Sequence, residues 1–225
     1  MKRPLYMLML TLMIVVSSEL QVPAVLPEMA RDLDVDTGKI GLLVSIFAIG
    51  MAIGGPVIAF TLRHRPPKHA LLTVVALYAV PEMLVPLVHE YWWVALMRLI
   101  TGCLAGAAVG LSVVYAARLA PNPSKIGEAV SIVLSGIMVG IVIGLPASHL
   151  IASVWNWQAT FYVLGAAAFL VFVISLLTLP ARDAATADDS AQDLRNLRLP
   201  ALWSRYLVSF LTIGAAYAAF SFFTP

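Results

Sequence analysis

Long apolar runs separated by short polar ones make up most of this sequence. Seven of the runs are long enough to cross a hydrocarbon core, which takes about 20 mostly apolar residues in a helix. They predict membrane-spanning helices near residues 5–26, 40–62, 69–88, 91–118, 129–153, 157–179 and 205–225. Residues 180–204 are polar and rich in Asp and Ala, which predicts a flexible, charged linker. The pattern as a whole predicts an all-α, polytopic membrane protein.

The basic residues outside the apolar runs predict the orientation of these helices. If the N-terminus is cytoplasmic, eleven lysines and arginines lie on the cytoplasmic side, and only Arg31 and Lys39 lie on the other. Loops rich in Lys and Arg stay in the cytoplasm. We therefore expect a multi-pass protein of the cytoplasmic (inner) membrane with its N-terminus and the 180–204 linker inside the cell.

The composition agrees with this class and excludes several others. Apolar residues make up 61% of the chain and charged residues 12%, whereas soluble domains are about half apolar and a quarter charged. The net charge of +2 comes from bases confined to short loops, which does not predict a nucleic-acid surface. One cysteine, four scattered histidines and no catalytic motif in the aqueous segments predict no metal site, no cofactor and no enzyme.

An internal repeat relates the first half of these helices to the second. A serine, two glycines and a proline recur at an offset of 90 residues: Ser45, Gly50, Gly54 and Pro56 correspond to Ser135, Gly140, Gly144 and Pro146. The offset places helices 1–3 on helices 4–6, and three crossings invert the second copy in the membrane. Inverted three-helix repeats, here about 1–90 and 91–179, are typical of transporters with a substrate site near the midplane. The alternative is ordinary packing, because Gly-x-x-x-Gly spacing is common in membrane helices.

One arginine and two carboxylates lie deep inside apolar runs. Arg98 is about 9 Å from Trp92 along its helix, Glu19 about 10 Å from Leu26, and Glu82 about 9 Å from the end of its helix. A guanidinium stays charged, so at membrane depth it faces a bundle interior or a watery cavity and has a partner. The alternative is that Arg98 extends to the membrane interface.

Several motifs of the chain resemble the major facilitator superfamily, in particular its drug:proton antiporter branch of arabinose-efflux-like and chloramphenicol-efflux-like permeases. The resemblance covers the whole chain and rests on these segments: Ser18–Leu20, Val25–Leu33, Gly41–Ser45, Gly54–Pro56, Arg98 with Gly102 and Gly106, Gly136–Pro146 and Trp157–Phe161. It implies a six-helix bundle of two inverted three-helix repeats (1–179), followed by a seventh helix (205–225) that begins a second half. It also implies secondary transport, with proton-coupled efflux of drug-like or sugar-like small molecules.

Two segments depart from the pattern of that branch. The loop between helices 2 and 3 usually carries an Asp and a Gly before its basic run, and Arg63–Lys68 has the bases without either residue. An Asp–Arg latch at this loop is therefore in doubt. The fifth-helix motif usually has adjacent Gly and Pro, whereas Gly144 and Pro146 are separated by Leu145.

The resemblance, in which helices 1 and 4 line the central cavity, gives the buried charges roles. We assign Glu19 as the carboxylate that binds a proton or the substrate, and Arg98 as the charge that tunes it. For Glu82 we expect either a coupling role or a local structural role beside Pro81. The alternative for the Glu19–Arg98 pair is a structural ion pair without a transport role.

The glycine motifs are assigned to gating and packing. They comprise Gly102 and Gly106 in helix 4, and Gly136, Gly140, Gly144 and Pro146 in helix 5. The expected partners are a small-molecule substrate, protons and the lipid bilayer. Because transporters of this family have two six-helix halves, an alternative is a truncated half-transporter. Such a chain is either inactive alone or works with a partner half or a second copy.

Overall fold

Polar and proline-containing breaks end the helices where the apolar runs end. The Asp36 carboxylate accepts a hydrogen bond from Gly38 N (2.7 Å) at the start of the second span. The Asn156 side chain accepts one from Ala159 N (2.8 Å) at the start of the sixth. Each cap satisfies a backbone donor that the first helical turn leaves free. Pro67, which lacks that donor, begins the third span.

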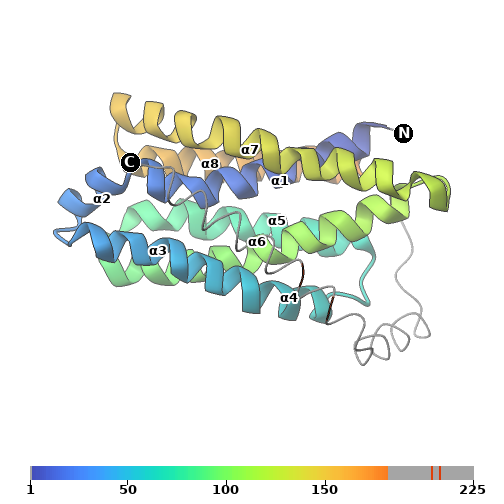
Figure 1. Ribbon diagram of the computed structural model, residues 1–225, viewed down its shortest axis with the longest axis horizontal. Coiled ribbons are helices and arrows are strands. Elements are labelled where there is room, and N and C mark those ends of the chain that lie inside the picture. The colour runs from blue at the N-terminus through green and yellow to red at the C-terminus, as the bar shows by residue number, and fades with distance from the viewer. Residues whose placement is uncertain (1, 182–203, 205–207, 209–225) are drawn as a thin grey trace. The chain divides into compact units, whose positions relative to one another are not determined.

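The computed structural model describes residues 2–181, 204 and 208 of the chain. Within residues 2–181 it contains helices and no strand (Figure 1). The helices are α1 (Lys2–Ala24), α2 (Leu26–Asp32), α3 (Thr37–Ile49), the π-helix η1 (Gly50–Gly54), α4 (Gly55–Thr61), α5 (Pro67–Leu84), the 3₁₀ helix η2 (Val85–Leu87), α6 (Tyr91–Leu119), the 3₁₀ helix η3 (Pro123–Lys125), α7 (Ile126–Val154) and α8 (Trp157–Thr178).

Six helical spans in the described part of the chain are long and apolar enough to cross a membrane. They cover Arg3–Ala24, Thr37–Thr61, Pro67–Leu87, Tyr91–Leu119, Pro123–Val154 and Trp157–Thr178. This confirms the predicted all-α, polytopic class. The predicted seventh helix (205–225) and nearly all of the 180–204 linker lie outside the described residues.

Local details differ from the predicted bounds. The first span ends at Ala24, one residue after Pro23, and the short helix α2 follows where a loop was expected. The fifth span begins near Pro123, about a turn and a half earlier than predicted. The second span contains a π-helical turn at Gly50–Gly54, for which helical periodicity gives no signal.

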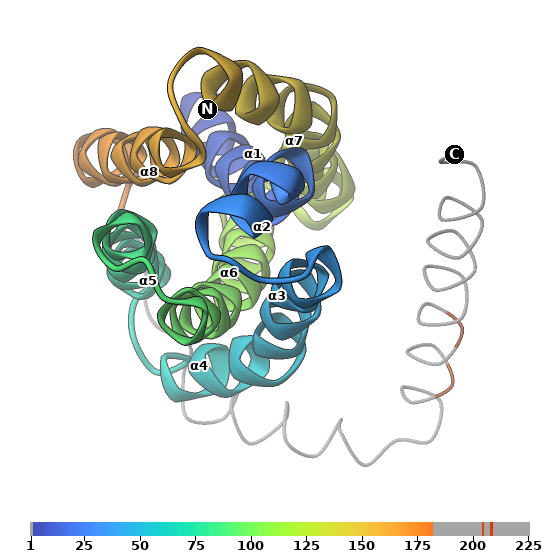
Figure 2. The ribbon, with the colours of Figure 1, turned by 90° about the vertical axis from the view of Figure 1, so that its left-hand side faces the viewer.

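Among the contacts between the six spans, three pairs are related by the repeat. Helix α1 packs along α7, α6 packs along α3–η1–α4, and α5 packs along α8 (Figure 2). Under the 90-residue offset, the spans that contain α1, α3 and α5 correspond to the spans that contain α6, α7 and α8. The pair of α1 and α7 therefore corresponds to the pair of α6 and α3–η1–α4. The pair of α5 and α8 corresponds to itself. Helices α1 and α6 run in opposite directions (Figure 1), as inverted copies do.

Glycines form the contact in both of the equivalent pairs. A Cβ atom on Gly140 would lie 2.7 Å from the carbonyl oxygen of Met13 in α1. At the corresponding position, a Cβ on Gly50 would lie 3.1 Å from the backbone nitrogen of Cys103 in α6. Cys103 is itself 90 residues after Met13. Both partners in the two contacts are therefore related by the same offset as the sequence motif.

We predict that Gly140→Leu destabilises the protein, because its side chain would meet the α1 backbone. Overpacking of this kind costs about 1–3 kcal/mol. Gly110→Leu is the matched control, since a Cβ at Gly110 meets nothing within 4 Å. Thermal unfolding in detergent, followed by circular dichroism, measures both. Equal unfolding temperatures for the two variants would contradict the packing described here.

Candidate functional site

A layer of polar side chains divides the apolar interior of the six-helix unit. One apolar cluster includes Leu8–Val15 of α1 and Ala70–Ala79 of α5, and another includes Val22 of α1, Val25 and Val85. Between them lie buried polar side chains from α1, α5 and α6: Ser17, Ser18, Gln21, Glu82, Arg98 and Thr101. Buried polar groups at membrane depth are costly, so this layer is the first candidate for a functional site.

Arg98 lies at the centre of this layer and is fully buried. Its Nη1 atom lies 3.9 Å from Oε1 of Glu82. The same nitrogen donates to the carbonyl oxygen of Ser18 (3.1 Å) and contacts the Ser18 hydroxyl (3.2 Å). The guanidinium also lies over the ring of Phe47, 4.3 Å from its centroid, a favourable place for a cation. Arg98 thus connects α6 with α1, α3 and α5.

Glu82 is held by two side chains of α1. The Ser18 hydroxyl donates to Oε1 (2.5 Å), and Gln21 Nε2 donates to Oε2 (3.1 Å). Ser18 therefore lies between the two charges, accepting from Arg98 and donating to Glu82. Tyr78, one turn before Glu82, is buried on the same side of α5, and its hydroxyl has no hydrogen-bond partner among the described residues. Each oxygen of the Glu82 carboxylate thus has one side-chain donor in place of water.

Two donors of the guanidinium have no partner. Arg98 Nε and Nη2 are buried and make no hydrogen bond to any of the described residues, and the same holds for Oε1 of Gln21. Buried polar groups are nearly always paired, so an unpaired one calls for an explanation. The guanidinium of Arg98 therefore has hydrogen-bonding capacity that the described residues do not use.

Glu19 lies beside this cluster without joining it. Its side chain is partly buried and, in the described part of the chain, forms no hydrogen bond or ion pair. It is close enough to Arg98 for electrostatic attraction. The structure thus places Glu19, Glu82 and Arg98 at one depth, as expected from the sequence. Arg98 forms its ion pair with Glu82 and not with Glu19.

The predicted gating glycines lie in the two glycine-mediated helix contacts. Gly102 and Gly106 of α6 face Phe47 and Met51 of the second span. Gly136, Gly140 and Gly144 of α7 face Met9, Met13 and Ser17 of α1. Pro146 lies inside α7, which continues to Val154.

Sequence analysis missed four members of the cluster: Ser18, Gln21, Phe47 and Tyr78. Two spacings could have pointed to three of them. Ser18 and Gln21 are three residues apart in an apolar helix, and Tyr78 and Glu82 are four apart, so each pair shares a helix face. Phe47 has no such signal, because an aromatic residue in an apolar helix is ordinary.

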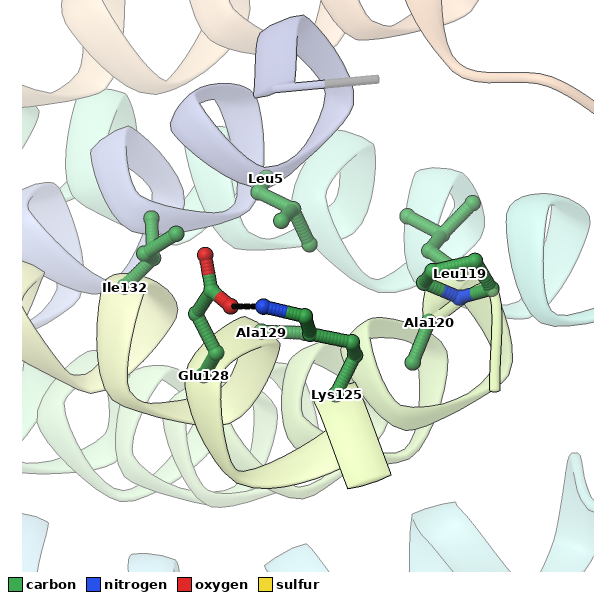
Figure 3. Close-up of a pocket in the computed structure, with 8 residues that line it drawn as sticks. Leu5, Leu119, Ala120, Lys125, Glu128, Ala129 and Ile132 are labelled. Atoms are coloured by element: carbon green, nitrogen blue, oxygen red, sulfur yellow. Dashed lines mark hydrogen bonds and ion pairs between the residues drawn. The ribbon is translucent and has the colours of Figure 1, made fainter. Parts of the chain in front are cut away.

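The pocket drawn in Figure 3 is separate from this cluster. It has a volume of about 230 Å³ and lies where the start of α1 meets the α6–α7 connection. Leu5 and Leu119 line it, and Lys125 Nζ and Glu128 Oε2 form an ion pair (2.7 Å) at its wall. Leu5 is about 20 Å from Ser18 along α1. Among the described residues there is also no group of three His, Cys, Asp or Glu that could hold a metal ion.

We predict that Glu82→Gln strongly destabilises the protein, because it leaves the Arg98 charge buried and uncompensated. Breaking a buried pair costs about 3–5 kcal/mol. The double variant Glu82→Gln/Arg98→Met removes both charges and is expected to recover part of the loss. Thermal unfolding of Glu82→Gln, of Arg98→Met and of the double variant measures the coupling energy between the two residues. Additive effects would show that the pair does not interact, and Glu19→Gln serves as the control outside the ion pair.

Comparisons with known proteins identify the family of this fold. The chain is 26% identical over 209 residues to the inner membrane transport protein YdhP of Escherichia coli K12, covering 93% of this chain and 54% of that protein. It is 28% identical over 226 residues to a chloramphenicol resistance protein of Streptomyces lividans, covering 99% of this chain and 57% of that protein. The chain thus spans about half the length of these curated relatives, and neither match supports the alternative of an inactive half-transporter.

A solved structure shares the fold. The proton:xylose symporter XylE of the major facilitator superfamily superposes with a TM-score of 0.70 at 15% identity, over 90% of this chain and 50% of that one. The family and the relatives are membrane transporters rather than enzymes. The Major Facilitator Superfamily model itself matches residues 7–225, so this chain belongs to that superfamily.

Proposed function

We propose that this chain serves proton-coupled efflux of drug-like or sugar-like small molecules across the cytoplasmic membrane, with its N-terminus inside the cell. The observation that carries the proposal is the fully buried Arg98, which has Glu82 as its fixed counter-ion and Glu19 close by. The name of a relative that is 22% identical over 90% of this chain, a probable sugar efflux transporter of Helicobacter pylori, supports the efflux direction.

Counting charges in the cluster explains how a proton and a substrate can alternate. Arg98 and Glu82 together are neutral, so an ionised Glu19 leaves one net negative charge at membrane depth. An isolated charge at that depth is unfavourable. Either a proton on Glu19 or a bound cationic group removes it. Release of one therefore favours binding of the other.

The unpaired donors of Arg98 suggest how Glu19 takes part. Nε and Nη2 have no partner among the described residues, and Glu19 follows Ser18 directly in the chain. An ionised Glu19 can rotate towards these donors, whereas a protonated one has less reason to do so. We assign Glu19 as the exchanging carboxylate, Arg98 as the charge that tunes it, and Glu82 as the group that holds Arg98 in place.

The glycine contacts are proposed as the surfaces along which the helices move. At these glycines the backbones of α1 and α7, and those of α6 and α3, come into close contact. Small sliding of packed helices is one known form of domain movement. Alternating access in this superfamily needs two six-helix halves, and residues 2–181 make one. We propose that the second comes from further chain or from a partner copy.

We predict that Glu19→Gln abolishes proton-coupled efflux, lowering it at least tenfold, while membrane insertion is unchanged. Accumulation of a fluorescent cationic dye in cells, with and without a protonophore, measures it. Glu90→Gln, which neutralises an exposed carboxylate before α6, is the matched control and is expected to behave as the wild type.

Three results would contradict parts of the proposal. Unchanged efflux in Glu19→Gln would remove Glu19 from the mechanism. Wild-type efflux that the protonophore does not affect would rule out proton coupling. Efflux by residues 1–181 alone would contradict the need for a second six-helix half.

A further inference from the structure

A groove of about 710 Å³ runs along the outer surface between α5 and α8. Leu72, Ala76 and Leu77 of α5 form one wall, and Phe172 and Leu176 of α8 form the other. Leu77 is 52% and Leu176 48% exposed, so the walls are open to the surroundings of the bundle. The groove lies outside the Arg98 cluster, whose members on α5 face inwards.

Basic side chains stand at one end of the groove. His64, Arg65 and His69 line this end. The side chains of Arg65 and His69 are exposed and form no hydrogen bond or ion pair with the described residues. Arg63, in contrast, is already engaged: its Nε donates to His64 Nε2 (3.0 Å), and its guanidinium lies 3.5 Å from the centroid of the Phe60 ring. Arg65 is therefore free to bind an anion.

The position of these bases matches the membrane boundary. They lie in and just after the loop between the spans Thr37–Thr61 and Pro67–Leu87. From His69 to Leu77 the apolar wall of α5 extends about 12 Å towards the membrane interior. A cation at the boundary above an open apolar groove is complementary to an amphipathic molecule with an anionic head and a long apolar tail.

We propose that this groove binds one anionic phospholipid. Arg65 and His69 contact its phosphate, and an acyl chain lies between Leu72, Leu77 and Phe172. Basic pockets between membrane helices are known to bind anionic head groups, and a guanidinium matches the geometry of phosphate oxygens. A zwitterionic lipid such as phosphatidylcholine also carries a phosphate, but its ammonium group offsets the negative charge that Arg65 and His69 attract. The bound lipid would link α5 to α8, which form the third pair of packed helices.

We predict that the purified protein retains one phosphatidylglycerol in native mass spectrometry. Phosphatidylcholine with the same acyl chains is expected to be retained at least fivefold less. Arg65→Gln/His69→Gln, which removes the head-group contacts, is expected to lose the retained phosphatidylglycerol. Ala76→Trp, which fills the groove and keeps both bases, is expected to lose it as well.

Matched controls separate a built site from general attraction of anionic lipid. Lys125→Gln removes a base from the same end of the bundle outside the groove, and Val80→Trp adds the same bulk to an exposed position of α5 outside the groove. Both are expected to retain the lipid. Equal retention of phosphatidylcholine, equal loss in Lys125→Gln, or full retention in Arg65→Gln/His69→Gln would overturn the proposal. Arg65→Gln/His69→Gln changes only exposed side chains, so its result decides the question even if Ala76→Trp does not fold.

Discussion

The buried guanidinium of Arg98 is the constraint on which the rest of this structure depends. A charge at membrane depth is tolerated only with a counter-ion and hydrogen-bond acceptors close by. The acceptors come from Ser18 on α1, and the counter-ion from Glu82 on α5. Helix α1 must therefore meet the consecutive spans α5 and α6 at one depth, and the apolar side chains pack in one cluster on each side of that level.

Close backbone contact complements this polar layer. Lipid tails are as apolar as Leu, so helices in a membrane associate through tight packing and hydrogen bonds rather than through the hydrophobic effect. The glycines of α7 bring it against Met13 of α1, and Gly50 brings the second span against Cys103 of α6. Because the repeat relates the two contacts, both three-helix repeats pack in the same way, with glycine against the backbone of a neighbouring helix.

Helix α5 connects the interior of the unit with its surface. Tyr78 and Glu82 face the Arg98 cluster, while Leu77 faces outwards along the groove shared with α8. A helix of 3.6 residues per turn can present both faces within a single turn. A molecule bound in the groove therefore contacts the helix that holds the counter-ion of Arg98, without touching the cluster itself.

The sequence by itself determined the class of this protein and the depth at which its charged residues lie within the helices. Length and hydropathy placed six spans to within about two turns, because the thickness of the membrane sets the length of a helix that crosses it. The rise of 1.5 Å per residue placed Arg98, Glu19 and Glu82 at one level. The spacing of glycines revealed the repeat, since a backbone contact leaves a residue-type signal at fixed positions.

Only the tertiary structure decided which carboxylate pairs with Arg98. Depth along a helix follows from sequence position, but the direction in which a side chain points depends on how each helix is rotated against its neighbours. Packing of α1 against α7 turns Ser18 and Gln21 towards Glu82 and leaves Glu19 beside the cluster. The π-helical turn at Gly50–Gly54 and the place of Phe47 under the guanidinium follow from the same contacts between helices, which are long-range in sequence and leave no local pattern.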